Sequence, residues 1–192
     1  EQALEQLLAL AEAAPIRDTE NLPLAEAEGR VLATHLVASL DLPPWPNSAM
    51  DGYALRLADW QGEPLPVSQR IFAGHPPQPL QPGTCARIFT GAPLPEGADC
   101  VEMQENTEVA EDGRVRFLEA LKTGQNIRPQ GQETTVGELV LSAGTRLGPI
   151  EQGLAASLGC AELDVVRKVR VAVLSTGDEL VEPGQTLGPG QI

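Results

Sequence analysis

Three prolines within residues 43–46 constrain the fold more than any other feature of this chain. Each proline fixes its own φ near about −65° and pushes the preceding residue into an extended conformation. Residues 47–52 (Asn-Ser-Ala-Met-Asp-Gly) then combine side chains that hydrogen-bond their own backbone with a glycine that permits positive φ. The segment predicts a stiff approach ending in a bend that presents the carboxylate of Asp51. An ordinary hairpin turn before a strand at Tyr53 accounts for the same pattern.

The region from Tyr53 to about Arg128 has the pattern of a small barrel or sandwich. Short apolar or alternating runs are separated by Gly/Pro turns, and glycine (19) and proline (17) are plentiful enough for frequent turns and short strands. These runs predict strands at residues 65–71, 84–89, 99–104 and 113–117.

The two flanks of this region mix helix and strand signals. Before it we expect a helix at 25–34 and a strand at 35–38; after it we expect a strand at 137–141, a helix at 149–158 and a strand at 162–166. The likeness of the flanks predicts an α+β fold, in which a β-rich domain II (43–134) is inserted into a small mixed α/β domain I (22–42 and 135–168).

Both ends of the chain look unpartnered. Apolar residues at helical spacing predict an amphipathic helix at 1–14, ended by Pro15, with too little surrounding chain to cover it. Residues 170–174 predict a buried strand, but one strand cannot make a sheet. We therefore expect the sequence to stop just inside a further domain.

Composition narrows the class of partner and compartment. A net charge of −14 argues against nucleic acid or an anionic membrane as the main partner. Three widely spaced cysteines without a Cys-x-x-Cys pair, and two isolated histidines, fit buried thiols in a reducing cytoplasm better than disulfides or zinc. No apolar run has the length of a membrane span. We predict a cytoplasmic protein.

Four carboxylates lie in turns or next to glycine: Asp51, Glu133, Asp178 and Glu179. Such groups suit Mg²⁺, which takes one or two carboxylates together with phosphate and water, although most carboxylates in so acidic a chain are solvated surface. Thr90-Gly91 could hold an oxyanion or simply be a strand exit. Arg128 is the best local anion contact, although surface arginines mostly bind nothing specific. Residue chemistry alone thus points to an acidic, metal-tolerant anion site.

Five segments occur in this order: residues 47–54 (Asn-Ser-Ala-Met-Asp-Gly-Tyr-Ala), 87–93 with 95–97, 124–128 (Gly-Gln-Asn-Ile-Arg), 143–145 and 175–180 (Ser-Thr-Gly-Asp-Glu-Leu). Together they resemble the MoeA family of molybdenum-inserting enzymes and the matching E domain of gephyrin. The resemblance implies an N-terminal part only, with 169–192 as the first strand and loop of a truncated α/β (MogA-like) domain III. It also implies that the helix within 1–21 packs on that domain.

The resemblance implies an enzyme that inserts molybdate into adenylylated molybdopterin with Mg²⁺ and releases AMP. The resemblance then implies catalytic roles for Asp51, Thr90 and Glu179. Glu179 and Asp51 are the expected metal ligands, with Asp51 also near molybdate or water, and Thr90 is the expected oxyanion contact. The expected substrate-binding residues are Ser48, Thr90, Arg128, Ser175 and Thr176. The family has Glu-Asp where this chain has Gln132-Glu133, so Glu133 is a doubtful metal ligand.

The resemblance also implies an elongated homodimer whose sites form between domain II of one subunit and domain III of the other. The molybdopterin adenylyltransferase is a further expected partner, and nucleic acid and membrane are not. The family's pterin-binding motifs would lie beyond Ile192, so we expect a fragment without its own pterin pocket. A gephyrin-type protein-interaction scaffold without activity is the alternative, although aromatic anchors are scarce at 3%.

Overall fold

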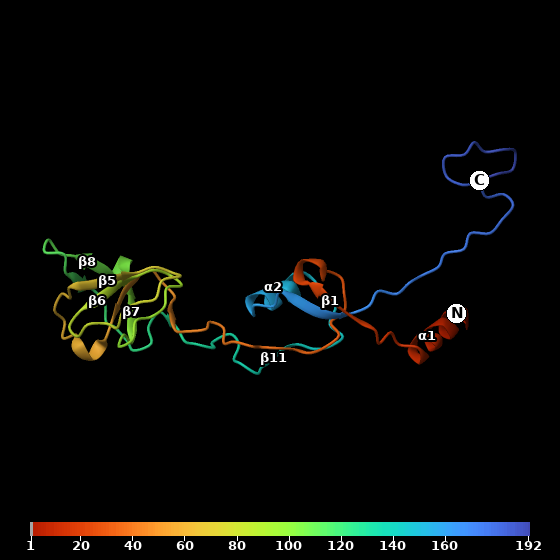
Figure 1. Cartoon of the computed structure of the whole chain (residues 1–192). Helices are drawn as coiled ribbons and strands as arrows, with labels where there is room; N and C mark the ends of the chain where they lie inside the picture. The colour runs from red at the N-terminus through yellow and green to blue at the C-terminus, as the bar shows by residue number, and fades with distance from the viewer. Residues whose placement is uncertain (1) are drawn as a thin grey trace.

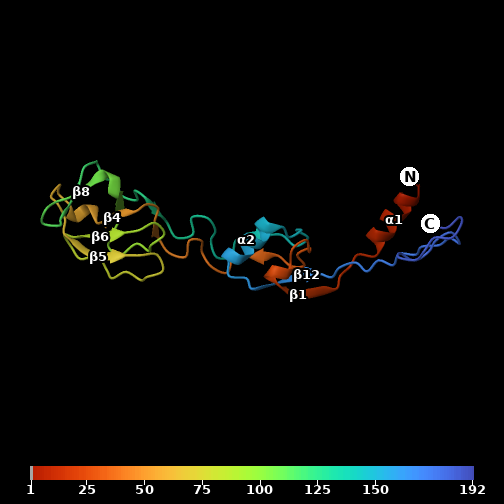
Figure 2. The same cartoon turned by 90° about the horizontal axis from the view of Figure 1, so that it is seen from above.

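The computed structural model describes residues 2–192 and shows an elongated molecule (Figures 1 and 2). A β-rich body forms one end, and a smaller α/β body lies in the middle. Helix α1 (Gln2–Ala13) and the tail after β12 (Glu162–Val166) form the other end. Both termini therefore lie far from the β-rich body.

The β-rich body is built on a four-stranded sheet in the order β5-β6-β4-β7. The central strand β4 (Gly52–Leu55) pairs antiparallel with both β6 (Cys85–Ile88) and β7 (Cys100–Met103), and β5 (Val67–Ile71) lies parallel to β6. All four residues of β4 are buried, so each face of the sheet is covered. Alternate residues along β4 consequently enter two different cores.

One core contains Tyr53 and Leu55, and the other contains Ala54. The first is closed by the hairpin of β8 (Thr107–Val109) and β9 (Val115–Phe117), and Trp60 packs edge-on against Phe117. The strands predicted within 65–71, 84–89, 99–104 and 113–117 are all confirmed, each somewhat shorter than expected.

The α/β body joins the two flanks of the chain. Strand β1 (Thr19–Pro23) pairs antiparallel with β12 along its whole length, and β2 (Leu36–Val37) pairs with β11 (Leu139–Leu141). Helix α2 (Pro149–Ser157) packs over them through Ala155, within a core that also holds Leu32, Leu147 and Val165. The predicted helix at 149–158 and strand at 162–166 are confirmed, with Gly159 at φ 78° just past the helix.

The helix predicted at 25–34 is wrong. Only a single 3₁₀ turn, η1 (Leu24–Glu26), forms there. Gly29 adopts φ 72°, which ends helical geometry, and Leu32 then pairs with β12 through a bridge to Val165. Long-range strand pairing thus replaces the local helical pattern.

The tail forms no strand at 170–174, contrary to the prediction. Val171, Val173 and Leu174 are 77%, 84% and 88% exposed. A strand needs neighbours for its backbone groups, and none of the described segments lies beside this one. Residues 179–192 instead close a loop through hydrogen bonds between Val181 N–H and the Ile192 carbonyl, and between Ile192 N–H and the Glu179 carbonyl.

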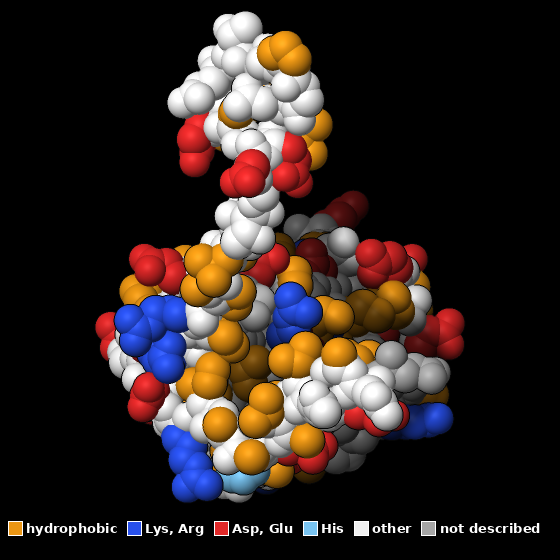
Figure 3. Space-filling view, turned by 90° about the vertical axis from the view of Figure 1, so that its right-hand side faces the viewer, with side chains coloured by type: hydrophobic (Ala, Val, Ile, Leu, Met, Phe, Trp, Pro, Cys, Tyr) orange, Lys and Arg blue, Asp and Glu red, His pale blue; other side chains and the backbone are white. Residues whose placement is uncertain are grey.

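Helix α1 has no buried residue. Its leucines at 4, 7, 8 and 10 are 57–66% exposed. Figure 3 views the end of the molecule that carries both termini, where hydrophobic side chains lie open over the middle of the face. The packing of α1 on a third domain stays a prediction. No helix in residues 2–192 has the length and apolar character needed to cross a membrane.

Two antiparallel connectors join the two bodies (Figure 1). Leu42 N–H donates to the Thr134 carbonyl at 2.8 Å, and Glu133 N–H donates to the Leu42 carbonyl at 2.8 Å. The Asp41 carboxylate accepts from Val136 N–H at 2.9 Å and from the Gln130 amide at 2.7 Å. The connectors are therefore hydrogen-bonded to each other along their length.

Candidate functional site

The proline-led segment ends in a turn that is held from within. The Ser48 hydroxyl donates to the Met50 carbonyl at 2.6 Å and accepts from Met50 N–H at 3.3 Å. Ala49 N–H donates to the Asn126 carbonyl at 2.9 Å. Ser48 is fully buried, so its hydroxyl belongs to the framework of the turn and not to an exposed binding surface. The substrate contact predicted for Ser48 stays a prediction, and it would compete with these hydrogen bonds within the turn.

Asp51 and Thr90 meet across 39 residues of sequence, as the predicted site requires. Thr90 N–H and the Thr90 hydroxyl both donate to Asp51 Oδ1, each at 2.7 Å. The backbone and side-chain hydrogen bonds from Thr90 lower the pKa of the Asp51 carboxyl; burial opposes this effect, and the nearby charge of Arg87 is the weakest contribution that lowers it. Asp51 is therefore a fixed, ionised carboxylate at neutral pH.

The same contacts alter the role expected for Thr90. Both of its donors point at Asp51, so neither is available to a bound oxyanion. Thr90 acts on the site by holding Asp51, and its predicted role as an oxyanion contact is not supported by this geometry. Asp51 Oδ2 receives no hydrogen bond from residues 2–192, which leaves one carboxylate oxygen open to a cation.

Arg87 clamps the backbone behind Asp51. Its guanidinium donates to the Gly52 carbonyl at 2.9 Å and to the side-chain oxygen of Gln104. The backbone N–H of Gln104 in turn donates to the Asp51 carbonyl at 3.0 Å. The guanidinium lies 5.1 Å from the Tyr53 ring and 4.6 Å from the Phe89 ring. Arg87 and Gln104 were missed by sequence reasoning, because strand register alone brings them to Asp51.

The residue after Asp51 is packed without room for a side chain. A Cβ at Gly52 would lie 1.9 Å from the Glu102 carbonyl oxygen on β7. Glu102 is itself a fully buried carboxylate, which accepts from Met103 N–H at 2.9 Å, from Asn106 at 3.0 Å and from Gln125 at 2.7 Å. These contacts fix the strand on which Asp51 depends.

The other predicted residues of the β-rich body lie around this turn or on the connectors. Arg128 is exposed on β10 (Ile127–Arg128), which pairs with β3 (Asn47–Ser48). Asn47 is buried, and its Oδ1 has no hydrogen-bond partner in the described part of the chain. Glu133 is exposed on a connector, where its backbone makes the hydrogen bonds. Arg128 remains a candidate anion contact beside the turn.

The tail residues predicted to share the site are not brought to it within one chain. Ser175, Thr176 and Glu179 are exposed in the tail, at the end of the molecule opposite to the β-rich body that carries Asp51 (Figures 1 and 2). Across residues 2–192 no three Asp, Glu, His or Cys side chains gather as a metal site would require. In this arrangement a single chain does not bring Asp51 and Glu179 to one cation.

Asp51 fits the role of one Mg²⁺ ligand, in a site whose other ligands this arrangement does not supply. An ionised carboxylate with one free oxygen is what this ion takes, alongside phosphate oxygens and water. The lowered pKa of Asp51 suits a cation ligand better than a general base, which works best with a pKa near the working pH.

Comparisons with known proteins identify one family over most of the chain. The family model "MoeA N-terminal region (domain I and II)" matches residues 1–159. The molybdopterin molybdenumtransferase of Haemophilus influenzae is 48% identical over 176 residues, covering 91% of this chain and 44% of that protein. The enzyme of the same name from Nostoc sp. is 45% identical, covering 92% and 42%.

Solved structures agree with the sequence relatives. A crystal structure of the molybdopterin biosynthesis MoeA protein from Pyrococcus horikosii matches 98% of this chain and 50% of that one, at 34% identity and a TM-score of 0.82. A second, from Pyrococcus horikoshii OT3, matches with a TM-score of 0.79 at 36% identity. The chain spans less than half the length of the curated relatives named above. Through the match over residues 1–159, this chain belongs to the MoeA family and corresponds to its N-terminal region.

Proposed function

We propose that the chain is the N-terminal part of an enzyme of molybdenum cofactor biosynthesis, which inserts molybdate into adenylylated molybdopterin and releases AMP. Membership of the MoeA family supports the class of reaction. The observation that carries the site is the carboxylate of Asp51, which two 2.7 Å hydrogen bonds from Thr90 fix in place and whose pKa they lower.

In this proposal Asp51 is the domain II contribution to a shared metal and substrate site. Its free oxygen would bind Mg²⁺, and a Mg²⁺ ion there would offset the charge of the substrate phosphates. Thr90 holds the carboxylate in one orientation, and Arg128 on β10 is a nearby anion contact. Glu179, with Ser175 and Thr176, would reach the site from the tail of a partner subunit in a homodimer.

The test is insertion activity in a full-length parent that carries the remaining domains. Asp51→Asn keeps the shape and the Oδ1 acceptor for Thr90 but removes the charge, and we expect at least about 100-fold lower kcat, as for other lost charge-stabilising groups. Glu179→Gln should behave alike. Asp59→Asn, on η2 (Leu57–Asp59), is the matched control and should retain wild-type turnover.

Two outcomes would overturn the proposal. Wild-type turnover by both Asp51→Asn and Glu179→Gln, with unchanged melting temperatures, would remove both residues from the site. Robust insertion by the 192-residue chain alone would contradict the need for the other domains, since we expect none.

A further inference from the structure

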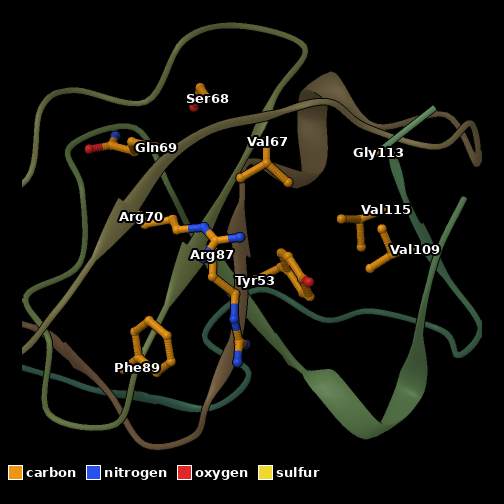
Figure 4. Close-up of a pocket in the computed structure, with 10 residues that line it drawn as sticks. All are labelled: Tyr53, Val67, Ser68, Gln69, Arg70, Arg87, Phe89, Val109, Gly113 and Val115. Carbon is orange, nitrogen blue, oxygen red and sulfur yellow. The ribbon is translucent and has the colours of Figure 1, made fainter. Parts of the chain in front are cut away.

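A pocket of about 610 Å³ opens on one face of the four-stranded sheet (Figure 4). Its apolar side is formed by valines from β5 and from the β8–β9 hairpin: Val67, Val109 and Val115. Its polar side is formed by Arg70, Arg87 and Tyr53. Of these residues only Arg87 takes part in the proposed insertion site, where its guanidinium donates to the Gly52 carbonyl and to Gln104.

Two arginines stand side by side at the polar end. Arg70 on β5 and Arg87 on β6 are direct partners in the parallel register. Like charges in opposite positions of a sheet destabilise it. The chain carries only 13 lysines and arginines and a net charge of −14, yet neither of these two has a carboxylate in salt-bridge contact within residues 2–192.

The fold explains Arg87 but not Arg70. Arg87 is held by the Gly52 carbonyl, by Gln104 and by the two aromatic rings beside it. Arg70 is exposed, and its side chain forms no hydrogen bond to any described residue. Figure 4 shows it reaching over the pocket toward Arg87 and Tyr53. It brings a second positive charge beside Arg87, and no carboxylate within residues 2–192 forms a salt bridge with it.

Tyr53 adds a donor to the same end. It lies next to Arg87 in the antiparallel register of β4 and β6, and it is 9% exposed. Its ring is covered by the core, and its hydroxyl donates to no other group in the described chain. A free guanidinium and a free phenolic hydroxyl therefore border the same pocket.

We propose that this pocket binds a phosphate monoester with a ring-bearing body. Arg70 would bind the phosphate through its forked guanidinium, the Tyr53 hydroxyl would donate a further hydrogen bond, and the valines would cover the body. The volume favours an ester, because small-molecule pockets measure roughly 300–1,000 Å³ and a bare phosphate would fill little of this one. The pocket shares only Arg87 with the proposed insertion site, so this binding does not depend on Asp51 or Glu179.

Binding can be measured on the 192-residue chain by titration calorimetry and by backbone amide NMR shifts. Uridine 5′-monophosphate supplies head and body, uridine the body alone and inorganic phosphate the head alone. We expect the monophosphate to bind at least about tenfold more tightly than either part and to weaken as salt rises. The shifted amides should lie on β5, β6 and the β8–β9 hairpin.

Arg70→Gln should weaken the monophosphate about tenfold and leave uridine unchanged, because an arginine–phosphate pair is lost. Arg17→Gln removes the same charge from the linker after α1 and should leave all three affinities unchanged. Equal affinity of wild type and Arg70→Gln for the monophosphate would overturn the proposal. So would equal affinity for the monophosphate and either part, or shifts confined to other surfaces. Since Arg70 is not part of the proposed insertion site, these results can be told apart from those of the Asp51 and Glu179 tests.

Discussion

Gly52→Ala should be among the most damaging single-methyl additions in this chain. The new Cβ would lie 1.9 Å from the carbonyl oxygen and 2.8 Å from the carbonyl carbon of Glu102, and 3.0 Å from the Met103 Cα. All three are backbone atoms of β7, so no side chain can rotate away. Gly52 is not among the glycines with positive φ, so the cost is steric and not conformational.

The magnitude follows from the separation that the two strands would need. Even a tight contact of 3.0 Å requires β4 and β7 to part by about 1 Å at this point. Backbone hydrogen bonds do not survive that stretch, and losing two of them costs about 1 kcal/mol each. Overpacking strain adds about 1–3 kcal/mol. The free energy of unfolding should therefore fall by about 3–5 kcal/mol.

Thermal unfolding followed by circular dichroism, with urea titration, measures this loss. For a domain of up to roughly 100 residues, such as the β-rich body, a loss of about 3 kcal/mol lowers the melting temperature by at least about 12 °C. Gly153→Ala is the matched control: the same methyl enters helix α2 with nothing within 4 Å, and it should stabilise by up to about 1 kcal/mol. A Gly52→Ala variant within 1 kcal/mol of wild type (about the precision of such comparisons) would refute the close approach of β4 and β7.

Two further predictions concern titration. The pKa of the Asp51 carboxyl, followed by carbon NMR, should lie below its ordinary value of 3.8, and Thr90→Val should raise it; an unchanged pKa in that variant would contradict the hydrogen bond from the hydroxyl. Because the pKa of Asp51 is lower in the folded state, its ionised carboxylate stabilises the fold above the unfolded-state pKa. This contribution to the free energy of unfolding is lost as pH falls through the folded-state pKa. Burial raises the pKa of Cys85 to about 12 and of Cys100 to about 11. At pH 8 an aromatic disulfide reagent should therefore react quickly with Cys160 alone in the folded chain, and with all three thiols only after unfolding. The raised pKa values also mean that stability falls as pH rises above about 9, where the unfolded thiols ionise; fast reaction of more than one thiol in the folded chain would contradict their burial.

Sequence reasoning succeeded where the signal is local. Pro149 at the start and Gly159 after the end delimit helix α2, and the residues between them carry the helical pattern. The short alternating runs of the β-rich region identified its strands for the same reason, since a period of two is visible without knowing the partner. The turn that presents Asp51 was also predicted, because its prolines and glycine act on neighbouring residues.

Sequence reasoning failed where the outcome depends on distant partners. Residues 25–34 carry apolar spacing that suits a helix, but pairing with β12 decides their conformation. The strand at 170–174 needs neighbours that no described segment supplies. The targets of the Thr90 donors and of the Arg87 guanidinium are set by the register of β4 and β6, so neither could be inferred from spacing along the chain.

The paired connectors between the two bodies have a mechanical consequence. A single polypeptide linker would let the β-rich body rotate about the long axis of the linker, because rotation about a few backbone bonds costs little free energy. Two strands fastened to each other from Asp41 and Leu42 to Thr134 and Val136 must twist as a ribbon, and their hydrogen bonds resist it. The orientation of the Asp51 carboxylate about the long axis of the molecule is thus set by the ribbon, while bending of the ribbon out of its own plane stays comparatively easy.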